Sequence, residues 1–375
     1  MRRELLLSLV VCAFSLSACQ SMNRYTVLTE DDEVAPDPQT ENTDPEPTVE
    51  PDPDPTDPEP DPDPVETTSP VEDCFAGIGS GAGAGPDYDQ FSPTIGSHCN
   101  GTNHQDINSI ERVVFLGDSV TVGTPPTDAD AVYRSILANE LAAEFGLDAP
   151  NWLWENVNVL EGTSLVRESG DFASCAEWGA RADDLMADNT QVEDCFPVSE
   201  RNKRTLVIMT VGGNDLANLT EGFIEGTPDA ELWNETHEFM GHVREAVEWI
   251  VTPGRFPNGV DVIFTNLYEF TDATGDTGSC PAASLAGFGA AVENPALEQM
   301  VLWSMEEFMS IADDTDTDML FLLENFCGHG FAKDDPSGRC YRGPSAELWF
   351  DLTCIHPNPR GHEVIADMFM SVVRE

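Results

Sequence analysis

Three separate segments of the chain carry residue types that suit acyl transfer. The segment FLGDSVTVG contains Ser119, VGGND contains Asn214, and CIHPN contains His356. A serine hydroxyl becomes a nucleophile when a histidine removes its proton, and an asparagine amide can donate to the oxyanion that then forms. The three residue types together therefore suit hydrolysis of an ester through an acyl-enzyme.

The segments around these residues are expected to be strands that alternate with helices. Buried-strand runs occur at Arg112–Leu116, Val157–Leu160, Thr205–Val211, Val260–Thr265 and Met319–Leu323. Apolar residues recur at helical spacing between them, over Ala131–Phe145, before Ile250 and after Gly361. Such alternation predicts an α/β fold in which helices cover both faces of a mainly parallel sheet. Ser119 and Asn214 directly follow two of these strands, and ligands bind at the carboxyl ends of parallel strands.

The order of the three segments resembles that of the SGNH or GDSL hydrolase family, over about residues 108–375. The resemblance implies a three-layer, flavodoxin-like sandwich and a serine ester hydrolase that needs no metal or cofactor. Carried over position by position, it implies Ser119 as the nucleophile and His356 as the general base. Asn214 matches the family's oxyanion amide.

The family also uses a glycine whose backbone N–H donates to the oxyanion. The segment WGARADDL looks like the family's glycine segment, so Gly179 is expected to join Ser119 and Asn214 in the oxyanion hole. Gly162, in the segment EGT, is the competing choice. A glycine suits this role because no Cβ hinders the approach of the backbone to the substrate oxygen.

The chain departs from the family pattern at the acidic member of the catalytic triad. That residue usually stands three positions before the histidine, where this chain has Thr353, and Asp351 lies five positions before it. Two alternatives follow. Either the loop lets Asp351 reach the imidazole, or a backbone carbonyl orients the ring and the enzyme works as a Ser–His dyad.

Composition limits the partners of the protein. The formal net charge of −52 argues against nucleic acid, because phosphate binding needs a basic surface. The expected substrate is a lipid or short acyl ester, or alternatively an O-acetylated polysaccharide. A rival from another class is a lipid-anchored binding module without turnover. A monomer is expected.

The amino-terminal region is expected to direct export. Residues 1–18 resemble a lipoprotein signal peptide, and the run LSAC resembles a lipobox that would make Cys19 the lipidated first residue. Residues 28–73 hold 18 acids and no base, so 19–73 is expected to be a disordered, proline-rich tether. A Gly-rich lead-in over 74–107 would follow. These features predict an outer-membrane lipoprotein, periplasmic or on the cell surface.

Eight cysteines remain after those of the signal peptide and the lipidation site, and in an exported chain they suggest four disulfides. Proximity in the sequence favours the pairs Cys74–Cys99 and Cys175–Cys195 and leaves the last four cysteines unassigned. The scattered histidines predict no zinc site, and the run Asp314–Asp318 is expected to be a solvated acidic loop.

Overall fold

The structure is a computed structural model that describes residues 104–374, with gaps at 187–189, 281, 283–294 and 339. All described residues belong to a compact unit that spans Ser69–Glu375. The expected signal peptide, Cys19, the tether and the pair Cys74–Cys99 lie outside the described residues, as does the lead-in up to residue 103.

A six-stranded sheet with the strand order β4-β5-β1-β6-β7-β8 forms the centre of this unit. Its strands are β1 (Arg112–Gly117), β4 (Glu168–Ser169), β5 (Phe172–Ser174), β6 (Thr205–Thr210), β7 (Val260–Thr265) and β8 (Asp318–Leu320). Every neighbouring pair is parallel except β4 with β5. The predicted mainly parallel sheet is therefore confirmed.

Both faces of the sheet are buried, as the alternation of side chains along β1 demonstrates. Val113 and Phe115 pack into an apolar cluster on one face, and Val114 and Leu116 pack into a second cluster on the other. The side chains of β6 alternate in the same way. Because successive strand residues point to opposite faces, a strand that is apolar at every position needs a helical layer on each side.

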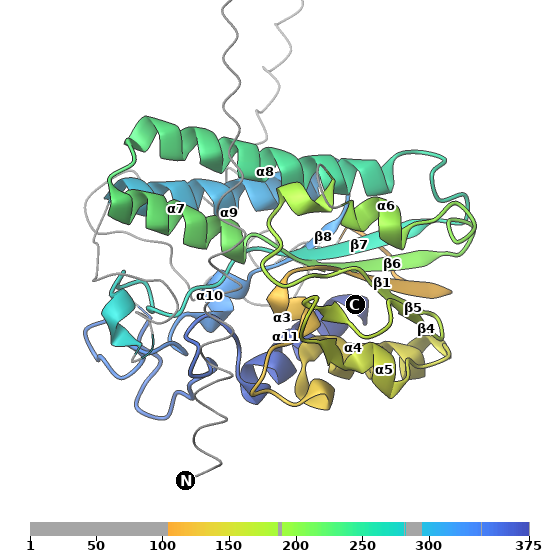
Figure 1. Cartoon of the computed structure of the whole chain (residues 1–375), viewed down its shortest axis with the longest axis horizontal. Coiled ribbons are helices and arrows are strands. Elements are labelled where there is room, and N and C mark those ends of the chain that lie inside the picture. Colours follow the sequence, from red (N-terminus) through yellow and green to blue (C-terminus); the bar gives the residue numbers. More distant parts are fainter. Residues whose placement is uncertain (1–103, 187–189, 281, 283–294, 339, 375) are drawn as a thin grey trace, which may run out of the picture. The chain divides into compact units, whose positions relative to one another are not determined.

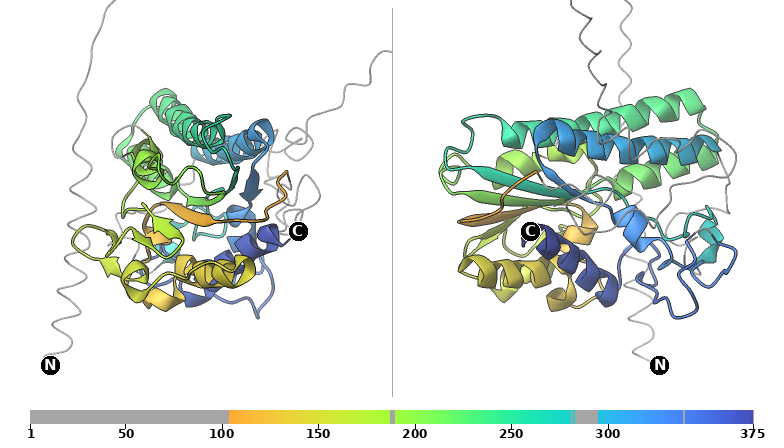
Figure 2. Two further views of the ribbon diagram at one scale, coloured as in Figure 1. Left: turned by 90° about the vertical axis from the view of Figure 1, so that its right-hand side faces the viewer. Right: turned by 180° about the vertical axis from the view of Figure 1, so that it is seen from behind.

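Helices supply these two layers (Figures 1 and 2). The helices are α3 (Ser119–Val122), α4 (Tyr133–Phe145), α5 (Trp152–Glu155), α6 (Gln191–Cys195), α7 (Gly213–Glu225), α8 (Asp229–Val251), α9 (Pro295–Thr315), α10 (Leu322–Phe326) and α11 (Pro359–Val373). Helices α7, α8 and α9 lie on one face of the sheet, and α4 and α11 lie on the other (Figure 1). This arrangement confirms the expected three-layer sandwich.

Two of the expected strands differ from those in the structure. The run Val157–Leu160 is not a strand of the central sheet, because only β2 (Val157–Asn158) is extended and it pairs with β3 (Thr163–Ser164) in a separate antiparallel hairpin. The second parallel strand along the chain is instead β5. The run Met319–Leu323 is shared between β8 and the start of α10.

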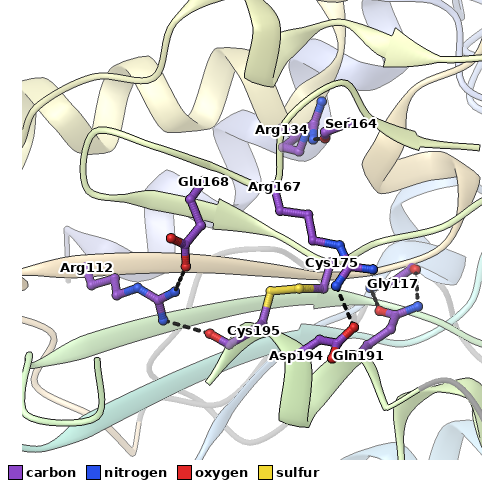
Figure 3. Close-up of a disulfide and its surroundings, with 10 residues drawn as sticks. All are labelled: Arg112, Gly117, Arg134, Ser164, Arg167, Glu168, Cys175, Gln191, Asp194 and Cys195. Atoms are coloured by element: carbon purple, nitrogen blue, oxygen red, sulfur yellow. Dashed lines mark hydrogen bonds and ion pairs between the residues drawn. A yellow bond between two sulfur atoms is a disulfide. The ribbon is translucent and has the colours of Figure 1, made fainter. Parts of the chain in front are cut away.

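Three disulfides connect described residues: Cys175–Cys195, Cys280–Cys354 and Cys327–Cys340. The first confirms a predicted pair. It joins the end of β5 to α6, beside Arg112 and Gln191 (Figure 3). The second reaches the loop that contains His356.

The acidic run Asp314–Asp318 is not the solvated loop that its composition suggests. Asp314 lies in α9, whereas Asp318 lies in β8 and is buried. The Asp318 carboxylate accepts hydrogen bonds from the backbone N–H of His104 and the side chain of Gln105, so it is enclosed by the residues that lead into the fold. In the part of the chain that the structure describes, no helix has the length and apolar character needed to cross a membrane.

Candidate active site

Three neighbouring strands bring the predicted site residues to one edge of the sheet. Strands β5, β1 and β6 lie side by side and run parallel, so their carboxyl ends meet at the same edge. Gly179 follows β5, Ser119 follows β1, and Asn214 follows β6. Strand β5 lies on one side of β1, and the next strand along the chain, β6, lies on the other side. Ligands of α/β proteins bind where the strand order reverses in this way.

A sharp turn after β1 presents Ser119. Gly117 has a φ of +135°, and a Cβ there would lie 2.0 Å from the Thr210 carbonyl oxygen, so only glycine fits. The Asp118 carboxylate accepts a hydrogen bond from the Val120 N–H at 2.9 Å and caps α3. Ser119 is therefore the first residue of a helix, with its side chain partly exposed at the strand end.

The His356 imidazole is hydrogen-bonded to Ser119. Its Nε2 lies 2.9 Å from Ser119 Oγ, although the two residues are 237 positions apart in the chain. Its Nδ1 lies 2.8 Å from Thr353 Oγ1. If Nδ1 carries the ring proton, Nε2 is free to accept the serine proton, which is the arrangement that a general base needs.

Asp351 lies on the far side of Thr353. The Thr353 hydroxyl donates to Asp351 Oδ1 at 2.5 Å, and the Thr353 backbone N–H donates to the same oxygen at 2.7 Å. The hydroxyl of Thr353 thus stands between the imidazole and the carboxylate, an arrangement that differs from both alternatives weighed from the sequence. The sequence signal for this hydrogen-bonded arrangement was the threonine that stands between Asp351 and His356.

The loop that carries His356 is held from several sides. The Tyr268 hydroxyl donates to the Ile355 carbonyl at 2.8 Å, and the Asp351 N–H donates to the His356 carbonyl at 2.9 Å. The Cys280–Cys354 disulfide attaches the middle of the loop to a segment 74 residues earlier. Beyond the histidine, the Asn358 side chain caps α11 through the Gly361 N–H. These contacts set the position of the imidazole relative to Ser119.

Burial governs the titration of the site. The partly buried position of the His356 ring lowers its pKa to about 4, because desolvation disfavours the charged imidazolium. Burial raises the pKa of Asp351, against the hydrogen bonds from Thr353, which lower it. The imidazole is therefore neutral near pH 7 and able to accept a proton.

Two backbone N–H groups in the segments that follow β1 and β5 have no acceptor among the described residues. These are the N–H groups of Ser119 and Gly179. Gly179 is exposed, with a φ of +77°. The Asn214 side-chain amide donates one hydrogen to the Ala180 carbonyl at 2.8 Å and carries a second hydrogen that can also be donated.

The glycine segment and the asparagine segment are joined to each other. The Asp215 carboxylate accepts from the Ala182 N–H at 3.1 Å, next to the bond between Asn214 and Ala180. Burial raises the pKa of Asp215, and of Asp118, to about 7. Both acids hold backbone N–H groups of the site loops, as expected for structural roles.

Gly162, the competing glycine, already uses its backbone. Its N–H donates to the Asn158 carbonyl at 2.8 Å, and its carbonyl accepts from the Trp178 N–H at 2.8 Å. A Cβ at this position would lie 2.8 Å from the Trp178 side chain. Gly162 therefore supports the segment that precedes Gly179, and its own N–H is not available to a substrate.

No metal centre accompanies this arrangement in the described ranges. Within them, no three His, Cys, Asp or Glu side chains are grouped so that they could hold a metal ion. The hydroxyl of Ser119 and the imidazole of His356 are the hydrogen-bonded pair that the structure shows at this edge of the sheet.

Comparisons with known proteins identify the family. Residues 113–369 match the model of the GDSL-like Lipase/Acylhydrolase family. Similar solved structures include an extracellular lipase from Streptomyces rimosus, 15% identical over 70% of this chain and 99% of that one, with a TM-score of 0.39. Another is LAE5, an alpha/beta hydrolase enzyme from the metagenome of Lake Arreo, Spain, 15% identical over 72% and 98% of the two chains, with a TM-score of 0.40.

An acetyl xylan esterase, AlAXEase, is 16% identical over 70% of this chain and 99% of its own, with a TM-score of 0.39. No curated protein sequence matches the chain. The family match covers well over half of the 375 residues. The chain therefore belongs to the GDSL-like lipase/acylhydrolase family and is an ester-hydrolysing enzyme.

Proposed function

We propose that the protein hydrolyses carboxylic esters through an acyl-enzyme on Ser119, with His356 as the general base. The observation that carries the proposal is the 2.9 Å contact between His356 Nε2 and Ser119 Oγ. A nucleophile and a base within hydrogen-bond distance, with the base oriented by a third group, are the arrangement that covalent acyl transfer requires.

The reaction proceeds in two steps, acylation of Ser119 and hydrolysis of the acyl-enzyme. Ser119 Oγ forms a bond to the ester carbonyl carbon while its proton passes to His356 Nε2. The tetrahedral intermediate collapses, the bond to the leaving alcohol oxygen breaks, and the imidazolium returns the proton to that oxygen. Water then attacks the acyl-enzyme by the same route, and the acid product and free Ser119 are released.

The negative charge on the intermediate's oxygen is stabilised by three N–H donors. These are the backbone N–H groups of Ser119 and Gly179 and the side-chain amide of Asn214. The proposal is supported by the absence of other acceptors for the two backbone groups within the described residues. Preorganised donors of this kind cost no reorganisation as the charge develops.

A short acyl ester or a lipid ester is the proposed substrate, and an O-acetylated polysaccharide is the alternative. The purified protein should be assayed with p-nitrophenyl acetate, butyrate and octanoate, then with acetylated xylan and phospholipid vesicles. A fluorophosphonate probe should label Ser119 in the wild type and give no label in Ser119→Ala. Folded protein that hydrolyses none of these esters and takes no label would instead be a binding module.

We also propose that the protein is exported and anchored through a lipidated Cys19. The support is the sequence alone: a basic start, a short apolar run and the residues LSAC. Expression in a bacterial host with labelled palmitate should place the label on the wild-type protein and not on Cys19→Ser. Fractionation would then assign the membrane, and light scattering would test the expected monomer.

A further inference from the structure

The side-chain hydroxyl of Thr353 is hydrogen-bonded to both His356 and Asp351. Its Oγ1 is 2.8 Å from His356 Nδ1 and 2.5 Å from Asp351 Oδ1. Among the described residues, no hydrogen bond joins Asp351 to the imidazole directly, and the two hydrogen bonds that Asp351 Oδ1 accepts both come from Thr353. The carboxylate and the ring are thus connected through a single hydroxyl group.

The available donors and acceptors determine the direction of each hydrogen bond between Asp351, Thr353 and His356. A carboxylate can only accept, so the single hydroxyl proton of Thr353 goes to Asp351 Oδ1. The lone pairs of Thr353 Oγ1 are then left to accept from His356, which requires the ring proton to be on Nδ1. Nε2 is therefore unprotonated and faces Ser119. The hydroxyl selects the tautomer that the reaction uses.

We propose that Thr353 is the positioning residue of the active site, a neutral hydroxyl that orients His356 and transmits the negative charge of Asp351 to it. This inference rests on the proposed roles of Ser119 and His356. It places Asp351 outside direct contact with the ring, so that Asp351 acts on the reaction only through Thr353.

A local structural role is the competing explanation. The Asp351 carboxylate closes a short turn by accepting from the Thr353 N–H, and aspartate closes many turns in this way. If that were the whole role, loss of the Thr353 hydroxyl would lower stability and leave turnover unchanged. The positioning role instead predicts that turnover falls while substrate binding does not.

The first test compares two substitutions of Thr353. Thr353→Val keeps the shape and removes the hydroxyl, and Thr353→Ser keeps the hydroxyl and removes a methyl group. We expect kcat for p-nitrophenyl butyrate to fall at least about 10²-fold in Thr353→Val with KM unchanged, since general base catalysis contributes typically 10²–10⁴-fold. Thr353→Ser should remain within about threefold of the wild type, because the hydroxyl bonds are retained.

The second test asks whether Asp351 acts through Thr353. Asp351→Asn and Thr353→Val should each lower kcat, and the double variant should be no worse than Thr353→Val alone, because residues that act as a unit are not additive. In the exchange variant, Asp351→Asn with Thr353→Asp, a carboxylate would contact the ring directly. Turnover lost in Asp351→Asn should then be regained.

The outcomes separate the inference from the proposed function. If the wild type is inactive and is not labelled at Ser119, the proposed function fails. If the wild type is active, His356→Ala is inactive and a folded Thr353→Val keeps wild-type kcat, only the inference fails. Equal losses in Thr353→Val and Thr353→Ser would also overturn it, because the hydroxyl would then not be the group that matters. Thermal melts of each variant establish that it is folded.

Discussion

The side chain of Gln191 binds the backbone of Gly117 through two hydrogen bonds. Its Oε1 accepts from the Gly117 N–H at 2.9 Å, and its Nε2 donates to the Gly117 carbonyl at 3.0 Å (Figure 3). Gln191 is buried and lies four residues before Cys195, whose disulfide to Cys175 fastens α6 to the end of β5. The turn that carries Ser119 is therefore held from a segment more than 70 residues away.

Replacing Gln191 with Met should impair turnover. The change keeps the length of the side chain but leaves the buried Gly117 N–H without its acceptor, at a cost of about 1–3 kcal/mol. It also removes one of two donors to the Gly117 carbonyl, which still accepts from the Glu177 N–H at 3.1 Å. We expect a lower melting temperature and a kcat reduced about 10- to 10²-fold, since small displacements of a nucleophile are costly. Asn139→Leu is the control: it removes one hydrogen bond from a side-chain amide to the backbone of α4 and should leave kcat unchanged.

Asn214→Ala should remove one oxyanion donor. Loss of such a donor costs about 10²–10³-fold in kcat in acyl-transfer enzymes. Asn218 lies one turn further along α7 and donates to Glu235 at 3.2 Å, so Asn218→Ala is a matched control on the same helix. Equal kcat values for the two variants would exclude Asn214 from the oxyanion hole.

Gly179→Ala should separate a catalytic from a purely structural effect. Gly179 has a φ of +77° and Gly146 a φ of +71°, and a Cβ at either position would meet nothing within 4 Å. Both alanine variants should therefore lose a similar stability of about 1–2 kcal/mol from backbone strain. Only Gly179→Ala should lose turnover, because alanine favours a negative φ that would turn the N–H away from the oxyanion. Parallel unfolding and kinetic measurements check this.

Removal of the Cys280–Cys354 disulfide should affect activity more than removal of Cys327–Cys340. Cys354 is the residue after Thr353 and two residues before His356, and it has a φ of +74°. Loop-closure entropy gives about 4 kcal/mol for the 74-residue loop and about 3 kcal/mol for the 13-residue loop. We expect paired Cys→Ala variants to differ little in stability and strongly in kcat at 25 °C. Similar kcat values would mean that Tyr268 and the local turn suffice to place His356.

The enzyme should remain active in mild acid. His356 must be neutral to accept the Ser119 proton, so activity falls as pH drops through its pKa, which burial lowers to about 4. At pH 5.5, kcat/KM should stay close to its value at pH 7.5, whereas a histidine with an ordinary pKa of about 6.5 would leave about a tenth of it. Burial also lowers the pKa of His362, to about 3, so this buried ring stays neutral at pH 5.5 and should not destabilise the fold. Near-ultraviolet circular dichroism at pH 5.5 checks that the protein remains folded. A midpoint near pH 6.5 would contradict the prediction.

Much of the fold could be predicted from the sequence because strand and helix periods are local. The strands β1, β6 and β7 appear within one or two residues of their predicted bounds, and the buried residues of α8 include Phe239, Val243 and Ile250. The prediction of Val157–Leu160 as a central strand was wrong, because a short apolar run looks the same in a surface hairpin. The three residues of β5 are too few to show a period.

The members of the candidate site were predictable where a local motif encodes them. Ser119 and Asn214 follow strands, and His356 precedes a proline–asparagine helix start, so each is recognisable from its own segment. The acceptor for His356 Nδ1 was not predictable in this way, and the sequence left only a choice between Asp351 and a backbone carbonyl.

Tertiary structure decided that choice, because it depends on the path of a loop whose anchors are distant in the chain. Cys280 and Tyr268 hold the segment between Asp351 and His356 from 74 and 87 residues earlier. With the loop held there, the hydroxyl of Thr353 faces the ring at hydrogen-bond distance. Residue types and spacing thus determined which groups are available for acyl transfer, and long-range contacts determined which oxygen orients the imidazole.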